Sequence, residues 1–229
     1  MRYKVILFDA DETLFDFHRS ERHAFAQTMQ EFGFPYEESL FLPAYQEINT
    51  AIWKEFEEGR IAQKDLKVER FRRFAVRIGA DFHPDDFAFA YETNLGAACF
   101  LLEGSEALVA ALHRTHRLAI ITNGLKRVQE VRIAQSPISH YFDAILISEV
   151  AGVSKPDPRI FDLVLSEIGH ADRKSVLMVG DSLTSDIQGG INAGIDTCWY
   201  NPGKADAKPG IRPTYEIGAL EELLQLVCG

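Results

Sequence analysis

The sequence predicts an α/β fold in which a parallel sheet lies between two layers of helices, with an all-helical domain inserted near its start. Short apolar runs alternate with longer amphipathic runs over most of the chain, and residues 17–99 contain no convincing strand. Strands that alternate with helices are typical of a parallel sheet, because each return to the start of the next strand needs a long crossover. We therefore expect a strand, a helical insert, and then a series of strand–helix units.

Five short apolar runs are expected to form the strands of this sheet. The first, Tyr3–Phe8, is almost continuously apolar, which is typical of a strand that is buried on both faces. The other four runs are Leu118–Ile121, Ala144–Ile147, Val176–Val179 and Thr197–Tyr200.

Amphipathic segments between these runs are expected to form the covering helices. They are Ser105–His113, Leu125–Ala134, Pro158–Ile168 and Ile187–Ala193. The third has clear boundary residues: Asp157 as the N-cap, Pro158 in the first turn and Gly169 just after the end. The segment Asn201–Pro213 is expected to be a loop.

The insert is expected to contain four helices. Apolar residues recur there at helical spacing, as in Ala44, Ile48, Ala51 and Ile52, and again in Phe71, Phe74, Ala75 and Ile78. Breaks are expected near Gly33–Pro35, Glu58–Gly59 and Gly79–Pro84. The sequence therefore predicts a core formed by residues 1–16 and 100–229, with a helical domain over 17–99 and a return linker near Leu102–Gly104.

Composition and charge limit the classes of partner. The formal net charge is −10, with 34 acidic against 24 basic residues, which disfavours binding to a nucleic-acid polymer or an anionic membrane. Cys99, Cys198 and Cys228 are expected to be reduced thiols, because they are odd in number and far apart. No apolar run approaches the roughly 18 residues that span a bilayer, and we expect a cytoplasmic protein. The sequence does not indicate an oligomeric state.

Chemically active side chains follow four of the five expected strands. Asp9 and Asp11 follow the first strand, Thr122 and Asn123 the second, Lys155 lies shortly after the third, and Asp181 and Asp186 follow the fourth. Because ligands of an open parallel sheet bind beyond the carboxyl ends of its strands, these groups should meet at one edge. The result is an acidic pocket with a single fixed cation, which suits Mg²⁺ together with a phosphate.

Each of these elements also has a simpler interpretation. The alternating acids after the first strand resemble a calcium loop, but Leu14 and Ser20 occupy the positions that need glycine and a bidentate glutamate. Asn123–Gly124 favours a turn whatever the chemistry, Lys155 could be a solvated surface residue, and Asp186 could stabilise a helix N-terminus. Four such elements in this order, each at a strand end, are much harder to explain without a shared function.

The combination resembles the haloacid dehalogenase-like hydrolase superfamily. Asp9–Thr13 is similar to its first motif, Thr122–Asn123 to its second, Lys155 to its third, and Gly180–Asp186 to its fourth. The insert matches the position and character of that superfamily's C1-type cap. The resemblance implies a Rossmann-like three-layer core with a helical cap, and phosphoryl-transfer chemistry that depends on Mg²⁺.

The resemblance also implies a role for each motif residue. Asp9 would be the nucleophile that forms an aspartyl-phosphate, and Asp11 the general acid and base, with crowding against Asp9 and Asp181 favouring its protonated form. Mg²⁺ would be held by Asp9, the backbone carbonyl of Asp11, and Asp181. Asp186 would order the metal's waters or Lys155.

Three further residues would hold the phosphate of the substrate. The resemblance gives Thr122, Asn123 and Lys155 this role, with the backbone amides after Thr122 contributing hydrogen bonds. Dehalogenases of the superfamily lack an acid two residues after the nucleophile, and phosphoglucomutase-like members usually read D-G-V there. The D-A-D of this chain therefore indicates a phosphatase.

The strings DADETLFDF, IITNG and VGDSLTSDIQGGINAGIDTCWYN are similar to a bacterial subgroup of pyrimidine 5′-nucleotidases. The resemblance implies nucleoside monophosphates as substrates, and sugar phosphates or other small phosphate monoesters remain the alternative.

Phe17, Trp53 and Phe56 are candidates for stacking on a base, although packing explains them equally well. A signalling receiver domain also gathers acids and a lysine, but it usually lacks such an insert.

Overall fold

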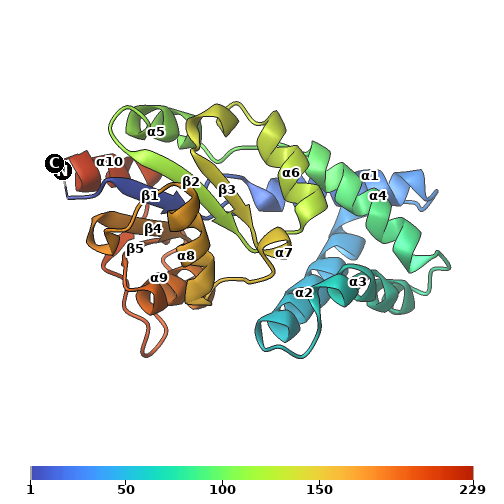
Figure 1. Cartoon of the computed structure of the whole chain (residues 1–229). Coiled ribbons are helices and arrows are strands. Elements are labelled where there is room, and N and C mark those ends of the chain that lie inside the picture. The colour runs from blue at the N-terminus through green and yellow to red at the C-terminus, as the bar shows by residue number, and fades with distance from the viewer. Residues whose placement is uncertain (1, 229) are drawn as a thin grey trace. The chain divides into compact units, whose positions relative to one another are not determined.

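The computed structural model of the protein describes residues 2–228, with the side chain of Cys228 outside the described part. These residues form two compact units (Figure 1). One contains residues 2–17 and 99–228, and the other contains residues 18–98.

A parallel sheet forms the centre of the first unit, as predicted. Within residues 2–228 its strand order is β3-β2-β1-β4-β5-β6, and every neighbouring pair is parallel. The strands are β1 (Val5–Phe8), β2 (Arg117–Thr122), β3 (Ala144–Ile147), β4 (Val176–Gly180), β5 (Asp196–Tyr200) and β6 (Tyr215–Ile217). β1 is fully buried between β2 and β4, which explains why its sequence is apolar at every position.

Helices cover both faces of this sheet, which makes the predicted three layers. The helices are α5 (Ser105–Leu112), α6 (Lys126–Gln135), α7 (Ser148–Ala151), α8 (Pro158–Glu167), α9 (Gln188–Ala193) and α10 (Leu220–Cys228). Leu108 of α5 and Leu223 of α10 pack with Phe8 on one face, while Phe161 of α8 packs with Leu7 on the other. Asp157 accepts a hydrogen bond from the backbone N–H of Arg159, so the N-cap predicted for α8 is confirmed.

The second unit is a bundle of α1 (Phe17–Glu31, which starts one residue before the unit), α2 (Glu38–Glu57), α3 (Gln63–Ile78) and α4 (Pro84–Ala97). Gly33, Gly59 and Gly79 lie between these helices with φ of 74°, 70° and 65°, a conformation that glycine adopts without strain. The predicted breaks are therefore confirmed.

The buried face of α2 contains polar and aromatic residues as well as aliphatic ones. Leu42, Tyr45, Asn49 and Ile52 are the buried residues of this helix, whereas Ala51, one of the apolar residues whose spacing indicated the helix, is exposed. Tyr45 stacks on Phe25 with ring centroids 4.6 Å apart, and large aromatic rings fill the bundle more effectively than the smaller aliphatic residues. Trp53 and Phe56 pack edge to face at 5.7 Å.

Two elements near the C-terminus were not predicted from the sequence. β6 is three residues long, which is too short to show an alternating pattern. Within residues 2–228 it is the edge strand beside β5. α10 follows it and covers the sheet through Leu220 and Leu223. Among the described residues, no helix combines the length and the apolar character that a membrane crossing requires.

Candidate active site

The sheet order brings the predicted motifs to one edge. Phe8 of β1 is in register with Ile120 of β2 and with Val179 of β4. The residues that follow these positions, which include Asp9, therefore lie at the same edge of the sheet. Since the chain continues from β1 to β2 on one side and reaches β4 on the other, this edge is a topological switch point, where open α/β sheets bind ligands.

Lys155 is a buried cation at this edge, with 2% of its surface exposed. Its Nζ contacts carboxylate oxygens of Asp9 and Asp186, the latter at 2.7 Å, and donates to the carbonyl oxygen of Ile121 at 2.7 Å. Burial disfavours the ammonium, but the charges of Asp186 and Asp9 outweigh this and raise the pKa of Lys155 above its usual value. The lysine is therefore a permanent positive charge beside Asp9.

Asn123 fixes the backbone that carries this lysine. Its side-chain Oδ1 accepts from the N–H of Lys155 at 2.9 Å, and its Nδ2 donates to the carbonyl of Lys155 at 2.9 Å. Nδ2 also lies 3.3 Å from Oγ of Ser185. The side chain predicted to contact phosphate thus joins the loops after β2, β3 and β4.

Three carboxylates lie close enough to share one cation. Carboxylate oxygens of Asp9, Asp181 and Asp186 all lie within 4.8 Å of one another. Burial raises the pKa of Asp9 to about 7 and that of Asp181 to about 9, and the neighbouring acids add to both shifts. A divalent cation would offset this repulsion, and carboxylate oxygens are the ligands that Mg²⁺ prefers. The donor set fits Mg²⁺, and Asp186, predicted to lie outside the metal's ligands, is part of this cluster.

Gly180, the last residue of β4, allows Asp186 to approach the strand end. Asp186 lies in the π-helical turn η3 (Leu183–Ile187), and its Oδ2 accepts from the N–H of Ser182 at 2.9 Å. A Cβ at position 180 would lie only 2.6 Å from Cβ of Asp186. Because real Cβ atoms do not come this close, a side chain at position 180 would displace Asp186 from Lys155.

Substituting Gly180→Ala is therefore expected to lower both stability and activity. Overpacking of this kind costs about 1–3 kcal/mol, and a shift of about 1 Å in a catalytic group can reduce turnover about 100-fold. Urea unfolding and steady-state phosphate release measure the two effects. Gly203→Ala is the matched control, because a Cβ there would meet nothing within 4 Å. If the two variants had the same unfolding free energy and the same rate of phosphate release, Gly180 would not be needed to let Asp186 approach the strand end.

Asp11 contacts a cation that was not predicted from the sequence. Its carboxylate contacts Nη2 of Arg132 through Oδ1, and its Oδ2 accepts from Nε2 of Gln129 at 2.7 Å. The sequence predicted crowding by acids and a single fixed cation, Lys155. The second cation, Arg132, is therefore a correction to the predicted pocket.

Gln129 and Arg132 are site residues that sequence reasoning missed. Both are on α6, three positions apart, and both are buried. Residues three apart share a helix face, so two polar residues on a face turned toward the sheet were the available signal. This signal was weak, because most residues of α6 are polar and two more polar residues do not stand out among them.

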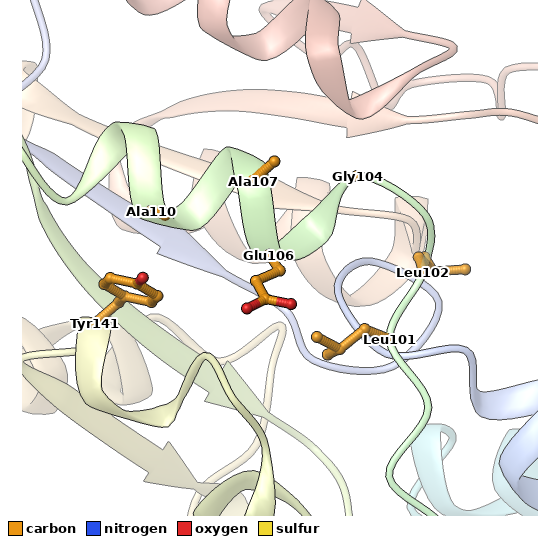
Figure 2. Close-up of a pocket in the computed structure, with 7 residues that line it drawn as sticks. All are labelled: Leu101, Leu102, Gly104, Glu106, Ala107, Ala110 and Tyr141. Carbon is orange, nitrogen blue, oxygen red and sulfur yellow. The ribbon is translucent and has the colours of Figure 1, made fainter.

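A hollow of about 510 Å³ lies elsewhere in this unit, beside α5. Leu101, Glu106 and Tyr141 line it (Figure 2). Among the described residues, those lining it include none of the predicted catalytic, phosphate-binding or metal residues. The strand-end cluster, and not this hollow, is the candidate active site.

Comparison with known proteins agrees with this geometry. A protein-family profile described as haloacid dehalogenase-like hydrolase matches residues 3–194. The chain is 37% identical over 228 residues to the pyrimidine 5′-nucleotidase YjjG of Escherichia coli, covering 100% of this chain and 99% of that protein. It is 36% identical over 225 residues to the pyrimidine 5′-nucleotidase PynA of Streptococcus pneumoniae, covering 98% and 94%.

A solved structure extends the likeness to three dimensions. The HAD-hydrolase YfnB of Bacillus subtilis, bound to magnesium, matches with a TM-score of 0.94 and 33% identity, covering 99% of each chain. The family resemblance predicted from the four motifs is confirmed by these comparisons. The chain belongs to the haloacid dehalogenase-like hydrolase family.

Proposed function

We propose that the protein is a Mg²⁺-dependent phosphomonoesterase that acts on nucleoside 5′-monophosphates, with a preference for pyrimidines. The observation that carries the proposal is a buried lysine that contacts two of three clustered carboxylates at the switch point of the sheet. Such a site combines a nucleophilic carboxylate with positive charge for a phosphate. The substrate class is supported by the full-length similarity to two pyrimidine 5′-nucleotidases.

In this proposal Asp9 attacks the phosphorus and forms an aspartyl-phosphate. Lys155, whose Nζ contacts Asp9, stabilises the negative charge on the transferring phosphoryl oxygens. Asp11 gives a proton to the leaving oxygen and later takes one from the water that hydrolyses the intermediate. Thr122 donates its hydroxyl hydrogen to a phosphoryl oxygen, and the backbone amides that follow it add further donors.

Asp9, Asp181 and the backbone carbonyl of Asp11 would hold the Mg²⁺, and Asp186, whose carboxylate belongs to the same cluster as those of Asp9 and Asp181, would order the metal's waters. When bound, the ion supplies positive charge that neutralises both the acids and the phosphate. We assign residues 18–98 the role of the cap that selects the leaving group. Substrate choice then resides in a unit separate from the chemical groups.

A substrate panel tests this function. Inorganic phosphate release is measured with pyrimidine and purine 5′-monophosphates and with sugar phosphates, each in Mg²⁺ and in EDTA. We expect the highest kcat/KM with a pyrimidine 5′-monophosphate. In EDTA turnover should fall at least about 100-fold, since the loss of a cation's charge at a phosphoryl group costs several kcal/mol.

Two results would contradict separate parts of the proposal. A higher kcat/KM with a sugar phosphate than with every nucleotide would make the protein a sugar phosphatase. Equal turnover in EDTA and in Mg²⁺ would contradict the metal requirement.

A further inference from the structure

We propose that Gln129 and Arg132 are positioning residues that set the direction of the Asp11 carboxyl and of the Thr122 hydroxyl. This inference rests on the roles proposed above for Asp11 and Thr122. It adds two residues of α6 that belong to none of the four motifs. Their contacts join the first motif to the second through a single amide.

The amide of Gln129 has one orientation that satisfies all its neighbours. Nη2 of Arg132 donates to Oε1 of Gln129 at 2.9 Å, which turns Nε2 toward the other side. Nε2 then donates to Oδ2 of Asp11 at 2.7 Å and to Oγ1 of Thr122 at 3.0 Å. A flipped amide would place a donor against the guanidinium and an acceptor against the carboxylate. Arg132 therefore determines which way Gln129 donates.

The hydroxyl of Thr122 is oriented by the same contact. Its oxygen accepts from Nε2 of Gln129 at 3.0 Å and from the N–H of Gly124 at 3.0 Å. A hydroxyl oxygen has two acceptor lone pairs and one donor hydrogen. With both lone pairs occupied, the hydrogen remains to donate, which is what a phosphoryl oxygen requires.

Arg132 occupies a position where an apolar side chain would pack at lower cost. It is 0% exposed, and its guanidinium lies over the ring of Phe15 at 5.1 Å. Among the described residues, its Nε and Nη1 have no hydrogen-bond partner. Burying unpaired donors is unfavourable, so packing alone does not account for an arginine here. Its contacts with Asp11 and Gln129 do.

Gly124 leaves the space that Gln129 occupies. A Cβ at position 124 would lie 2.7 Å from Cγ and 2.8 Å from Cδ of Gln129. The backbone of Gly124 is outside the left-handed region, so alanine would not strain it there. The substitution Gly124→Ala would therefore displace the Gln129 side chain without changing its chemistry.

The test compares two esters that differ in their need for a general acid. 4-Nitrophenyl phosphate has a stable leaving group that departs without a proton, whereas phenyl phosphate depends on protonation. The parameter is the ratio of kcat/KM for 4-nitrophenyl phosphate to kcat/KM for phenyl phosphate, because kcat/KM reports the step in which the leaving group departs. Neither ester is a nucleotide, so the result does not depend on the proposed substrate class.

The variants are Gln129→Met and Gly124→Ala, with Gln135→Met as the matched control on the exposed side of α6. We expect phenyl phosphate kcat/KM to fall about 30-fold and 4-nitrophenyl phosphate kcat/KM about threefold, which is less than the roughly 10²–10⁴-fold that a general acid contributes, because Asp11 itself is retained. The ratio then rises about tenfold in both variants and stays unchanged in the control. Arg132→Lys, which keeps the charge but not the forked geometry, should raise the ratio by a smaller factor.

Asp11→Asn is the reference variant that separates the acid role of Asp11 from the positioning role of Gln129 and Arg132. If it raises the ratio while Gln129→Met and Gly124→Ala lower both kcat/KM values equally or not at all, the positioning role is overturned and the acid role of Asp11 stands. If Asp11→Asn leaves the ratio unchanged, the acid role and the positioning role both fail. Should Gln129→Met not fold, the ratio in Gly124→Ala decides alone.

Discussion

Replacing Asp9 with asparagine should reduce phosphate release at least about 10⁴-fold, because loss of a nucleophile leaves only binding and electrostatic contributions. The two side chains have the same shape, and the amide oxygen can still accept from Lys155. The measurement is phosphate release from a good aryl ester at saturating Mg²⁺. Trapping of ³²P on the wild type but not on the variant identifies the acyl-phosphate directly.

The same substitution should make the folding stability of the metal-free protein less dependent on pH. Burial raises the pKa of Asp9 to about 7 from its ordinary value of 3.8. The carboxyl is therefore protonated more readily in the folded state than in the unfolded state. Its ionisation costs stability as the pH rises from about 4 to 7, and the full cost is present above 7. Asparagine has no such cost.

Melting temperatures in EDTA measure this difference. We expect Asp9→Asn to melt at or above the wild type at pH 8, with the gap narrowing as the pH falls toward 4. A variant that retains turnover would contradict the nucleophile role. One that melts well below the wild type at pH 8 would show that the Asp9–Lys155 contact outweighs the cost of burying the carboxylate.

Replacing Lys155 with methionine should both destabilise the fold and lower kcat/KM about 10³-fold or more. Methionine fills a similar volume but leaves the carboxylates of Asp9 and Asp186 without the cation that both contact. Removing one partner of a buried ion pair costs about 3–5 kcal/mol. The free energy of unfolding in EDTA, from urea titration, and phosphate release in Mg²⁺ give the two values.

Lys126→Met is the matched control. Lys126 is exposed, and its Nζ forms an ion pair with Oε1 of Glu130 at 3.8 Å. Exposed pairs of this kind contribute about 0–1 kcal/mol, so little change is expected. Saturating Mg²⁺ should recover part of the stability lost in Lys155→Met, since the ion adds charge beside the same acids. Equal unfolding free energies for the two variants in EDTA would show that Lys155 does not compensate the carboxylates.

The local sequence was sufficient to predict the elements that repeat a clear pattern. β1 is apolar at every position because it is buried on both faces, and α8 begins at Asp157–Pro158 because those residues favour a helix start. β6 was missed, since a three-residue edge strand has too few positions to show a period. α10 was also missed, although its nine residues alternate apolar and polar side chains at helical spacing. The spacing of apolar residues indicated a helix at α2, but it did not show that Tyr45 and Asn49 lie in the core.

The sequence by itself determined which residues follow each strand, and therefore that Asp9, Thr122, Lys155 and Asp181 belong to one edge of a parallel sheet. It did so because strand burial and helix boundaries are local properties of the chain. Only the tertiary structure decided that Asp186 lies close enough to Asp9 and Asp181 to share a cation with them, and that Asp11 contacts Gln129 and Arg132. Gln129 and Asp11 are 118 residues apart, and no local pattern encodes such a contact. It exists because the sheet order places β2 beside β1, which brings α6 to the end of β1.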